Sequence, residues 1–202
     1  GYTFTGWTIS GYDETAKHGT DEDAVTNTIA STSTLIKSTY FKNLRKTSGT
    51  VTLTANWSAN TYTINYELNN GTHGSSHPTS ATFDNVVTID NPTKEGYSFA
   101  GWTITSGLNT STAKHGTTNS TVTSPIENSS TKIMSKYFKN LTPSGSVTLT
   151  ANWSSNTYTL TLDGNGVSVS PTSTPATYDS TYKDLPNLTR DGYTFNGWYI
   201  GN

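Results

Sequence analysis

The chain has 202 residues, a formal net charge of −2 and no cysteine, and its length suits one large domain or two ordinary ones. It has no basic patch, no apolar run of the roughly 20 residues that span a membrane, and no thiol for a disulfide, a nucleophile or a zinc site, which excludes the corresponding classes of protein. Serine and threonine form about a third of the sequence, and together with 12 Tyr and 5 Trp this composition favours β-strands.

Internal repetition is the strongest signal in the sequence. The block GYxFxGW begins at Gly1, Gly96 and Gly192. Four further blocks occur twice, in the same order and 96 or 97 residues apart: TAKHGT at Thr15 and Thr112, YFKNL at Tyr40 and Tyr137, VTLTANW at Val51 and Val147, and TYT at Thr61 and Thr157. The chain therefore holds about two periods of a unit of about 96 residues.

Two polar links suggest where one unit ends and the next begins. They are Ser58-Ala59-Asn60 and Ser154-Ser155-Asn156, each between a VTLTANW block and a TYT block. If they are boundaries, residues 1–57 are the C-terminal part of a unit, 58–156 a complete unit with flanking links, and 157–202 the N-terminal part of the next. The alternative is that the links are hairpin turns inside one domain. Because the chain opens inside a repeated block, we expect it to be a piece of a longer protein.

Alternation of apolar and polar residues predicts the main strands. It runs through 51–57 and 147–153, and again through 61–68 and 157–162, so each of these segments is expected to be a strand with one buried face. The side chains expected on that face are Val51, Leu53, Ala55, Trp57, Tyr62, Ile64, Tyr66, Leu68, Val147, Leu149, Ala151, Trp153, Tyr158, Leu160 and Leu162.

The GYxFxGW block predicts another strand. In the middle copy, Tyr97 and Phe99 fall on one side and Trp102 and Ile104 on the other, and Gly101 suggests a β-bulge. Repeated tryptophans within strands indicate core packing rather than a platform for stacking sugars. We therefore expect one core for residues 61–153, formed by Tyr62, Ile64, Phe99, Trp102, Val147, Leu149 and Trp153.

The remaining segments carry weaker signals. Short strands are expected at 81–89 and 176–178, and no helix is expected as a shared feature of the copies. The intervals 10–36 and 105–132 are polar and rich in Gly, Ser, Thr and Asn, which predicts long surface loops with edge strands at most. The fold class expected from all these signals is mainly β.

Several of the blocks together resemble the Listeria–Bacteroides repeat family, which includes the internalin B-repeats. The family pattern is a leading YTVTFD-type strand, a glycine-rich loop, a P-T-(K/R)-x-G-Y-x-F-x-G-W block and a closing LTAxW strand. Here the counterparts are 61–71, 92–102 and 147–153 in the complete unit, and 157–166 with 188–198 in the next. The resemblance implies tandem β-grasp-like modules on secreted or wall-attached bacterial proteins, without catalytic residues. The interval before the closing strand is longer than usual, which leaves room for a polar loop insertion or added strands.

No group of residues indicates catalysis or metal binding. His18 and His115 lie in the repeated TAKHGT block without cysteine or a repeated carboxylate, so they are expected to be loop residues held by their neighbours. His73 and His77 have no copy elsewhere. The acidic run Asp21–Asp23 would suit calcium, but the second copy of that loop has no acidic residue, which favours a solvated loop. We predict no catalytic residue, no cofactor, no metal site and no enzymatic activity.

The predicted function is structural. We expect a repeat segment of an extracellular bacterial surface protein, secreted or attached to the cell wall, that acts as a spacer, stalk or filament and projects from or connects cells. Its partners would be neighbouring units of the parent chain or other copies of itself. The alternative is an adhesive module that binds a host or matrix glycan or protein through the long loops. Nucleic acid is not expected as a partner, and this segment is expected to have no membrane span.

The incomplete units lead to one further expectation. In a β-grasp-like sheet the opening TYT strand and the closing VTLTANW strand of a unit lie side by side at the centre. Residues 1–57 lack the first of these strands, and residues 157–202 lack the second. Unpaired backbone groups are costly when buried, so we expect each part to be completed by chain neighbours or by another molecule.

Overall fold

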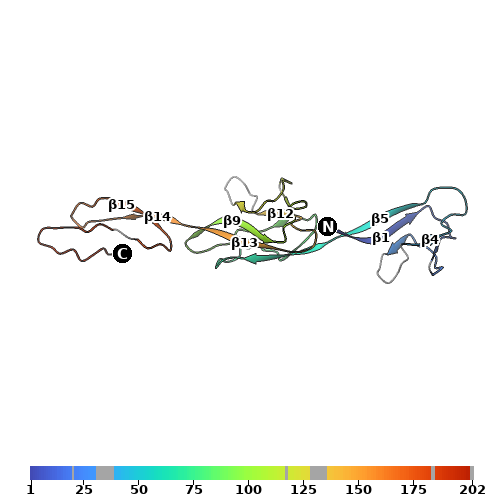
Figure 1. Cartoon of the computed structure of the whole chain (residues 1–202), viewed down its shortest axis with the longest axis horizontal. Coiled ribbons are helices and arrows are strands. Elements are labelled where there is room, and N and C mark those ends of the chain that lie inside the picture. The colour runs from blue at the N-terminus through green and yellow to red at the C-terminus, as the bar shows by residue number, and fades with distance from the viewer. Residues whose placement is uncertain (20, 31–38, 117, 128–135, 183–184, 201–202) are drawn as a thin grey trace.

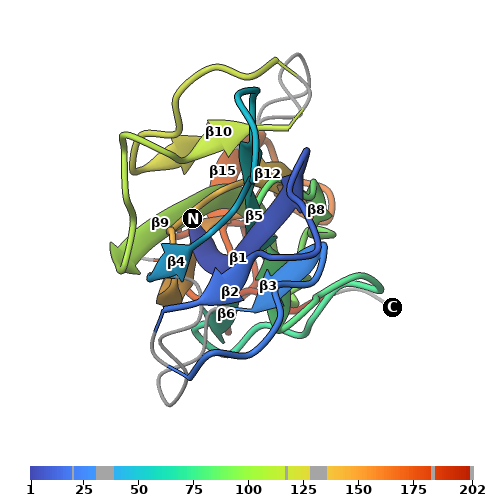
Figure 2. The same ribbon diagram turned by 90° about the vertical axis from the view of Figure 1, so that its right-hand side faces the viewer.

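The computed structural model contains β-strands and no helix in the part of the chain that it describes, which confirms the mainly β prediction. The described residues are 1–19, 21–30, 39–116, 118–127, 136–182 and 185–200. Figure 1 shows three lobes along one axis, here called the first lobe (1–59), the middle lobe (61–155) and the third lobe (157–200). Figure 2, turned by 90°, looks along the row so that the lobes overlap. Within the described ranges, no helix is long and apolar enough to cross a membrane.

A five-stranded sheet forms the base of the middle lobe. Its strands, in spatial order, are β11 (Ile126–Glu127), β9 (Tyr97–Ser106), β13 (Gly145–Ser155), β6 (Thr61–Glu67) and β7 (Ser80–Thr82). The opening strand β6 and the closing strand β13 run parallel, from Gly145 opposite Tyr62 to Thr150 opposite Glu67. The two strands thus lie side by side as predicted, while the β-grasp-like fold itself stays a prediction.

A smaller sheet covers one face of this base. Its order is β10 (Lys114–His115), β12 (Tyr137–Lys139) and β8 (Val87–Thr88), so the predicted strand 81–89 is two short strands, β7 and β8, in different sheets. One hydrophobic core joins both layers. The predicted core residues all belong to it: Tyr62, Ile64, Trp102, Val147 and Leu149 are buried, and Phe99 and Trp153 are partly buried against them.

The described part of the polar interval 105–132 is mostly exposed and supplies the edge strand β11, as predicted, but it also contributes buried residues to this core, which the prediction of a surface loop missed. Ala113 and Val122 are fully buried and Ile126 is buried at the sheet edge. In the first lobe, the interval 10–36 likewise supplies buried apolar residues. These residues are scattered through polar sequence without any periodicity, so only the folded chain brings them together. Residues 20, 31–36, 117 and 128–132 of the two intervals lie outside the described residues.

The first lobe repeats part of the middle one. Its main strand β1 (Tyr2–Ser10) lies between β3 (Thr28–Ala30) and β5 (Thr52–Ala59), in the same arrangement as β9 between β11 and β13. Beside them β2 (Lys17–His18) pairs with β4 (Phe41–Lys42). A small core lies within this lobe, formed by Ile9, Ala16, Val25 and Ile29.

The third lobe contains a single pair of strands in its described part. β14 (Thr157–Thr161) pairs with β15 (Ser173–Thr177), the counterparts of β6 and β7. The third copy of GYxFxGW, at 192–198, is not a strand here. Its tryptophan is nevertheless held, because Trp198 Nε1 donates a hydrogen bond to the carbonyl of Pro186 at 2.9 Å.

The predicted β-bulge is present, and it changes which side chains share a face of the sheet. The pairing of β9 with β13 shifts between Phe99 and Gly101, and β1 shifts likewise between Phe4 and Gly6. The extra residue turns Phe99 and Trp102 to the same side, with ring centroids 5.1 Å apart. The prediction that they face opposite sides is wrong, because it assumed an unbroken two-residue period.

Two aromatic residues predicted to be buried are exposed in the end lobes. Trp57 is 60% exposed and Tyr158 is 50% exposed, whereas Tyr62, the counterpart of Tyr158, is 1% exposed. Among the described residues, β5 pairs only with β1, and β14 only with β15. Each strand therefore lacks the second neighbour that covers its counterpart in the middle lobe.

Candidate functional site: the joints between lobes

The chain crosses from lobe to lobe through one asparagine at each joint. β5 ends at Ala59 and β6 begins at Thr61, with Asn60 between them, and Asn156 stands in the same way between β13 and β14. The strands on the two sides of each asparagine belong to different sheets. The links are thus shorter than the three residues inferred from sequence, since the other residues of each link continue the preceding strand.

The backbone of each asparagine is bonded to both lobes. Asn60 N–H donates to the carbonyl of Gly1 in the first lobe at 2.8 Å, and its own carbonyl accepts from Phe83 N–H in the middle lobe at 2.8 Å. Asn156 repeats the pattern, donating to Gly96 and accepting from Tyr178 N–H, both at 2.9 Å. The joint thus leaves neither backbone group of the asparagine free, which restricts rotation there.

The asparagine side chains add a second set of bonds. Thr3 Oγ1 donates to Asn60 Oδ1 at 2.6 Å, and Ser98 Oγ donates to Asn156 Oδ1 at 2.6 Å. At the first joint the Asn60 amide also donates to the carbonyl of Pro143 at 3.3 Å. Asparagine suits this position because its short side chain accepts a hydrogen bond from the preceding lobe, while its backbone carbonyl accepts one from the following lobe.

Aromatic pairs bridge the lobes beside each asparagine. Tyr2 meets Phe83 edge to face at 5.4 Å, and Tyr97 meets Tyr178 in the same geometry at 5.7 Å, both with an interplanar angle of 73°. Such pairs contribute about 0.5–1.5 kcal/mol beyond the area they bury. The preceding glycine permits the approach, since a Cβ on Gly96 would lie 2.2 Å from the Tyr178 ring.

A tyrosine hydroxyl closes each joint by donating to an aspartate of the following lobe. Tyr97 Oη donates to Asp179 at 2.8 Å, and Tyr2 donates to Asp84. The bond to the Asp179 carboxylate raises the pKa of Tyr97, because losing the proton would place two negative charges side by side. The pKa of Tyr178 is also raised, chiefly by the charge of Glu95.

The aspartate of the first joint is itself held in place. Asp84 N–H donates to Asn140 Oδ1 at 2.5 Å, and Asn140 Nδ2 donates back to Asp84 Oδ1 at 3.0 Å. Lys139 Nζ lies 4.0 Å from the same carboxylate. The YFKNL block, which contains Lys139 and Asn140, thus positions the acceptor for Tyr2.

Sequence reasoning missed these joint residues, although a signal for them exists. It treated Tyr97 as a strand residue and did not single out Asp84 or Asp179. The segments ATFD at 81–84 and ATYD at 176–179 are 95 residues apart and share an aromatic residue followed by aspartate. A repeated acid next to a repeated aromatic residue, each in a turn, is the pattern that would have identified the contact.

Two of the four histidines are buried and two are exposed. His18 and His115 are buried, at 4% and 3% exposure, with their rings against Phe41 and Phe138 at 5.8 and 5.9 Å. They are therefore part of the folded layer, where the phenylalanine of the YFKNL block holds them, rather than of a surface loop. His73 and His77 are exposed and stack at 4.2 Å, and partial burial together with the charge of His77 lowers the pKa of His73.

The acidic run of the first lobe takes part in local contacts. Asp23 N–H donates to Asp21 Oδ1 at 3.2 Å, and Glu22 pairs with Lys42. Among the residues that the structure describes, no three His, Asp or Glu side chains are grouped closely enough to hold a metal. The absence of a metal site stays a prediction.

Calcium should not stabilise the chain. A ligand that binds only the native state raises the midpoint of thermal unfolding, so scans with calcium and with a chelator are expected to overlay. The measurement is differential scanning calorimetry at matched ionic strength, with magnesium as the control for non-specific cation effects. A rise in Tm specific to calcium would contradict this prediction.

The family of the chain follows from comparison with known sequences. A family model, the Listeria-Bacteroides repeat domain, matches residues 62–127 and 158–202, more than half of the chain. The chain belongs to this family. Each match to the Listeria-Bacteroides repeat begins two residues after a joint asparagine. The resemblance inferred from the sequence blocks is thereby confirmed.

Longer bacterial proteins contain segments similar to this chain. Over 151 residues (72% of this chain) it is 32% identical to an Evansella cellulosilytica protein named as a membrane protein, and over 156 residues (76%) it is 30% identical to one named as a Gly-rich membrane protein. It is 33% identical over 108 residues (54%) to Internalin H of Listeria monocytogenes. These matches span 19%, 15% and 15% of the three relatives, respectively. No solved structure matches the chain.

Proposed function

We propose that this segment is a non-catalytic spacer in an extracellular bacterial surface protein, where Listeria-Bacteroides repeats joined stiffly end to end hold another part of the protein away from the cell. The observation that carries the proposal is the joint. The same backbone clamp, hydroxyl bond, aromatic pair and tyrosine–aspartate bond occur at Asn60 and at Asn156. A joint built twice from matching residues sets one angle between neighbours, as a stalk requires.

The same observation supports the division of the chain. We place unit boundaries at the two joints, so that 58–156 is a complete repeat with its links, 1–57 the C-terminal part of one unit and 157–202 the N-terminal part of the next. The start of each family match just after a joint supports this division. The adhesive alternative concerns the long loops, parts of which (31–38 and 128–135) lie outside the described residues.

A distance measurement across the first joint tests the proposal. Because the chain has no cysteine, spin labels can be attached through T54C and N65C, two exposed positions on β5 and β6. The labelled residues are 11 positions apart, and an extended chain rises about 3.3 Å per residue, so we expect one narrow distance distribution near 36 Å.

Two controls calibrate the width of that distribution. The pair N65C and T105C lies within the middle lobe and reports the width of a rigid body. Insertion of Gly-Gly after Asn60 breaks the clamp and should broaden the distribution across the joint. If the unaltered joint gives a distribution as broad as the insertion variant, the spacer proposal is wrong.

A further inference from the structure

The chain enters and leaves the middle lobe on neighbouring strands. It enters on β6, which begins at Thr61 directly after the first joint, and it leaves on β13, which ends at Ser155 directly before the second joint. The two strands run parallel to each other over six residue pairs. In Figure 1, β13 runs along the row of lobes, so a pull on the two ends of the middle lobe acts along these strands.

The parallel direction decides how such a pull is shared. Tension draws the start of β6 one way and the end of β13 the other way, so the two strands must slide past each other along their length. The backbone hydrogen bonds of a parallel pair are evenly spaced and slanted alike, so sliding strains all six pairs together. A pull applied across one end of the pair would instead break the bonds one after another.

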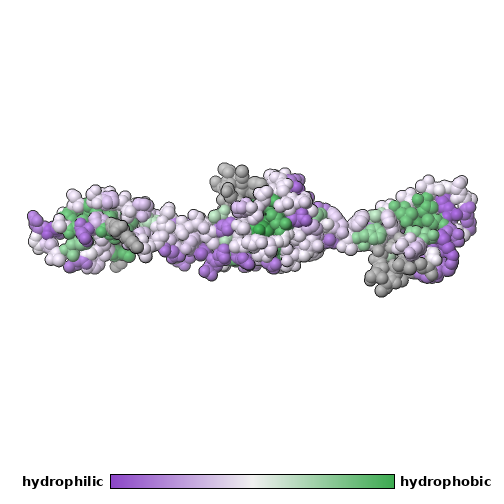
Figure 3. All heavy atoms as spheres, in the orientation of Figure 1, coloured by the Kyte–Doolittle hydropathy of each residue, from purple (hydrophilic) through white to green (hydrophobic). Residues whose placement is uncertain are grey.

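Both strands lie inside the sheet, where their surroundings protect the contact between them. β6 has β7 on its other edge, and β13 has β9. Buried side chains cover one face of the pair, Tyr62 and Ile64 from β6 and Val147 and Leu149 from β13. Figure 3 shows one small apolar patch on the visible face of the middle lobe, surrounded by neutral and hydrophilic residues. The buried face excludes water, which would otherwise replace a strained backbone bond.

Three side-chain hydrogen bonds extend the contact at and beyond the last residue pair. Each joins β13 to the end of β6 or to the turn that follows it. Thr150 Oγ1 donates to Glu67 Oε2 at 3.0 Å, Asn69 Nδ2 donates to the carbonyl of Ala151 at 2.9 Å, and Trp153 Nε1 donates to the carbonyl of Leu68 at 2.9 Å. Sliding of the two strands would stretch all three bonds.

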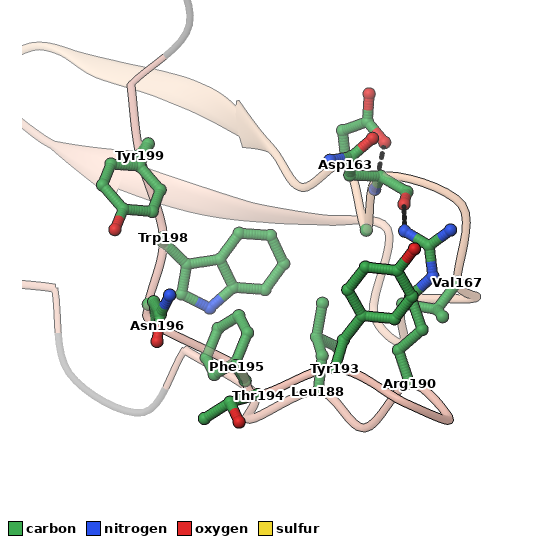
Figure 4. A pocket seen from close by; sticks show the side chains of 13 residues that line it. Asp163, Val167, Leu188, Arg190, Tyr193, Thr194, Phe195, Asn196, Trp198 and Tyr199 are labelled. Carbon is green, nitrogen blue, oxygen red and sulfur yellow. Dashed lines mark hydrogen bonds between the residues drawn. The ribbon is translucent and has the colours of Figure 1, made fainter.

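The turn that carries Asn69 has a backbone shape that recurs in the repeat. Asn69 has φ +51°, and its counterpart Asn165 after β14 has φ +47°. Figure 4 shows that second turn with Asp163, Val167 and Arg190 around it. There Asp163 Oδ1 accepts a hydrogen bond from the Asn165 N–H at 2.9 Å, and the Asn165 carbonyl accepts one from Arg190 at 3.1 Å. Because both copies share the left-handed asparagine, this geometry belongs to the repeat.

We propose that the middle lobe is a tension-bearing unit, in which a pull that enters through β6 and leaves through β13 is resisted in shear by their parallel pairing and by the side-chain bonds of residues 67–69. A surface protein whose far end is held by another object is stretched along its chain, and a unit of this topology keeps its length under that tension. The inference goes beyond the spacer function, which concerns bending at the joints, and it holds whether or not the joints are stiff.

Pulling the same lobe in two directions tests the proposal. The chain has no cysteine, so handles for single-molecule force spectroscopy can be attached at pairs of introduced cysteines. T61C with S154C applies force along the strands from opposite ends, whereas T61C with S144C applies it across one end of the pair, and all three positions are exposed. At one loading rate, the first combination should need at least about twofold more force to unfold the lobe, because the residue pairs resist together.

Two controls make this comparison specific. Thermal unfolding should give the same midpoint for both double variants, so that a difference in force reflects direction rather than stability. Release of the roughly 90 residues between T61C and S154C should lengthen the chain by about 300 Å, which identifies the middle lobe as the part that unfolds. Equal unfolding forces in the two directions would overturn the proposal.

A matched pair of substitutions tests the side-chain bonds. N69G tolerates the positive φ but removes the bond to Ala151, so it should lower the force along the strands by roughly a tenth, as one of the interactions that share the pull. The force across the strands should not change, because the bond lies at the far end from those handles. N70G, at φ +66°, removes a side chain that has no hydrogen bond among the described residues, and should change neither force. If N69G and N70G act alike, or if N69G lowers both forces equally, the side-chain bonds do not resist sliding and that part of the proposal is wrong.

Discussion

Replacing Trp102 by alanine is expected to lower the free energy of unfolding of the middle lobe by ~3–5 kcal/mol. Trp102 is 1% exposed, lies 5.1 Å from Phe99 and 5.9 Å from Tyr66, and pairs across the sheet with Ala151. A loss of this size is comparable with the whole stability of many domains, ~5–15 kcal/mol, so W102A should leave this lobe partly or wholly unfolded.

The cost comes from packing rather than from hydrogen bonding. The buried Nε1 of Trp102 has no hydrogen-bond partner among the described residues, so its removal breaks no hydrogen bond described here. W102F keeps an aromatic ring and should cost less than W102A, while W57A, at a 60% exposed site in another lobe, should leave the middle lobe unchanged. Hydrogen exchange of the β13 amides measures the middle lobe alone, and unchanged exchange in W102A would contradict the core assignment.

Replacing Gly96 by alanine is expected to open the joint between the middle and third lobes. Gly96 has φ +73°, where a side chain is strained by roughly 1–2 kcal/mol, and its new Cβ would meet the ring of Tyr178 at 2.2 Å. The ring must move, and with it the contacts of Tyr97 with Tyr178 and Asp179. Spin labels at T105C and T161C should then show a broader distance distribution.

The chain supplies a matched control at the next copy of the same glycine. Gly192 has a similar φ, +79°, but apart from its two chain neighbours no described residue has an atom within 4 Å of the position of its Cβ. G192A therefore carries the backbone strain without the clash, and should leave the joint unchanged. Similar distance distributions for G96A and G192A would show that the aromatic contact does not hold the joint.

The titration of Tyr97 gives a second readout of the same substitution. The bond to Asp179 raises the pKa of Tyr97, so this contact is intact below the usual tyrosine pKa and is lost as the pH rises through the raised value. In G96A the pKa of Tyr97 should fall toward its ordinary value. NMR of ring-labelled tyrosine measures it, and an unaltered titration would show that the bond survives.

Much of the middle-lobe core can be predicted from the sequence. Tyr62, Ile64, Val147 and Leu149 are buried because a pleated strand turns every second residue to one face, and that rule acts within a few residues of chain. Repetition of the blocks identified the family in the same way. The bulge at Gly101 was also predictable, but its effect on Phe99 and Trp102 was not, since it depends on the register with the partner strand.

Tertiary structure decided how far the end strands are buried and which residues meet at the joints. The same VTLTANW sequence is buried in β13 and half open in β5, so its exposure depends on a neighbouring strand rather than on its own residues. Ala113 and Val122 are buried in the core that both layers share, without any periodic signal of their own. Tyr97 and Asp179 are 82 residues apart in sequence, and they meet only because the chain passes through Asn156 without turning back, which brings the end of one lobe against the start of the next.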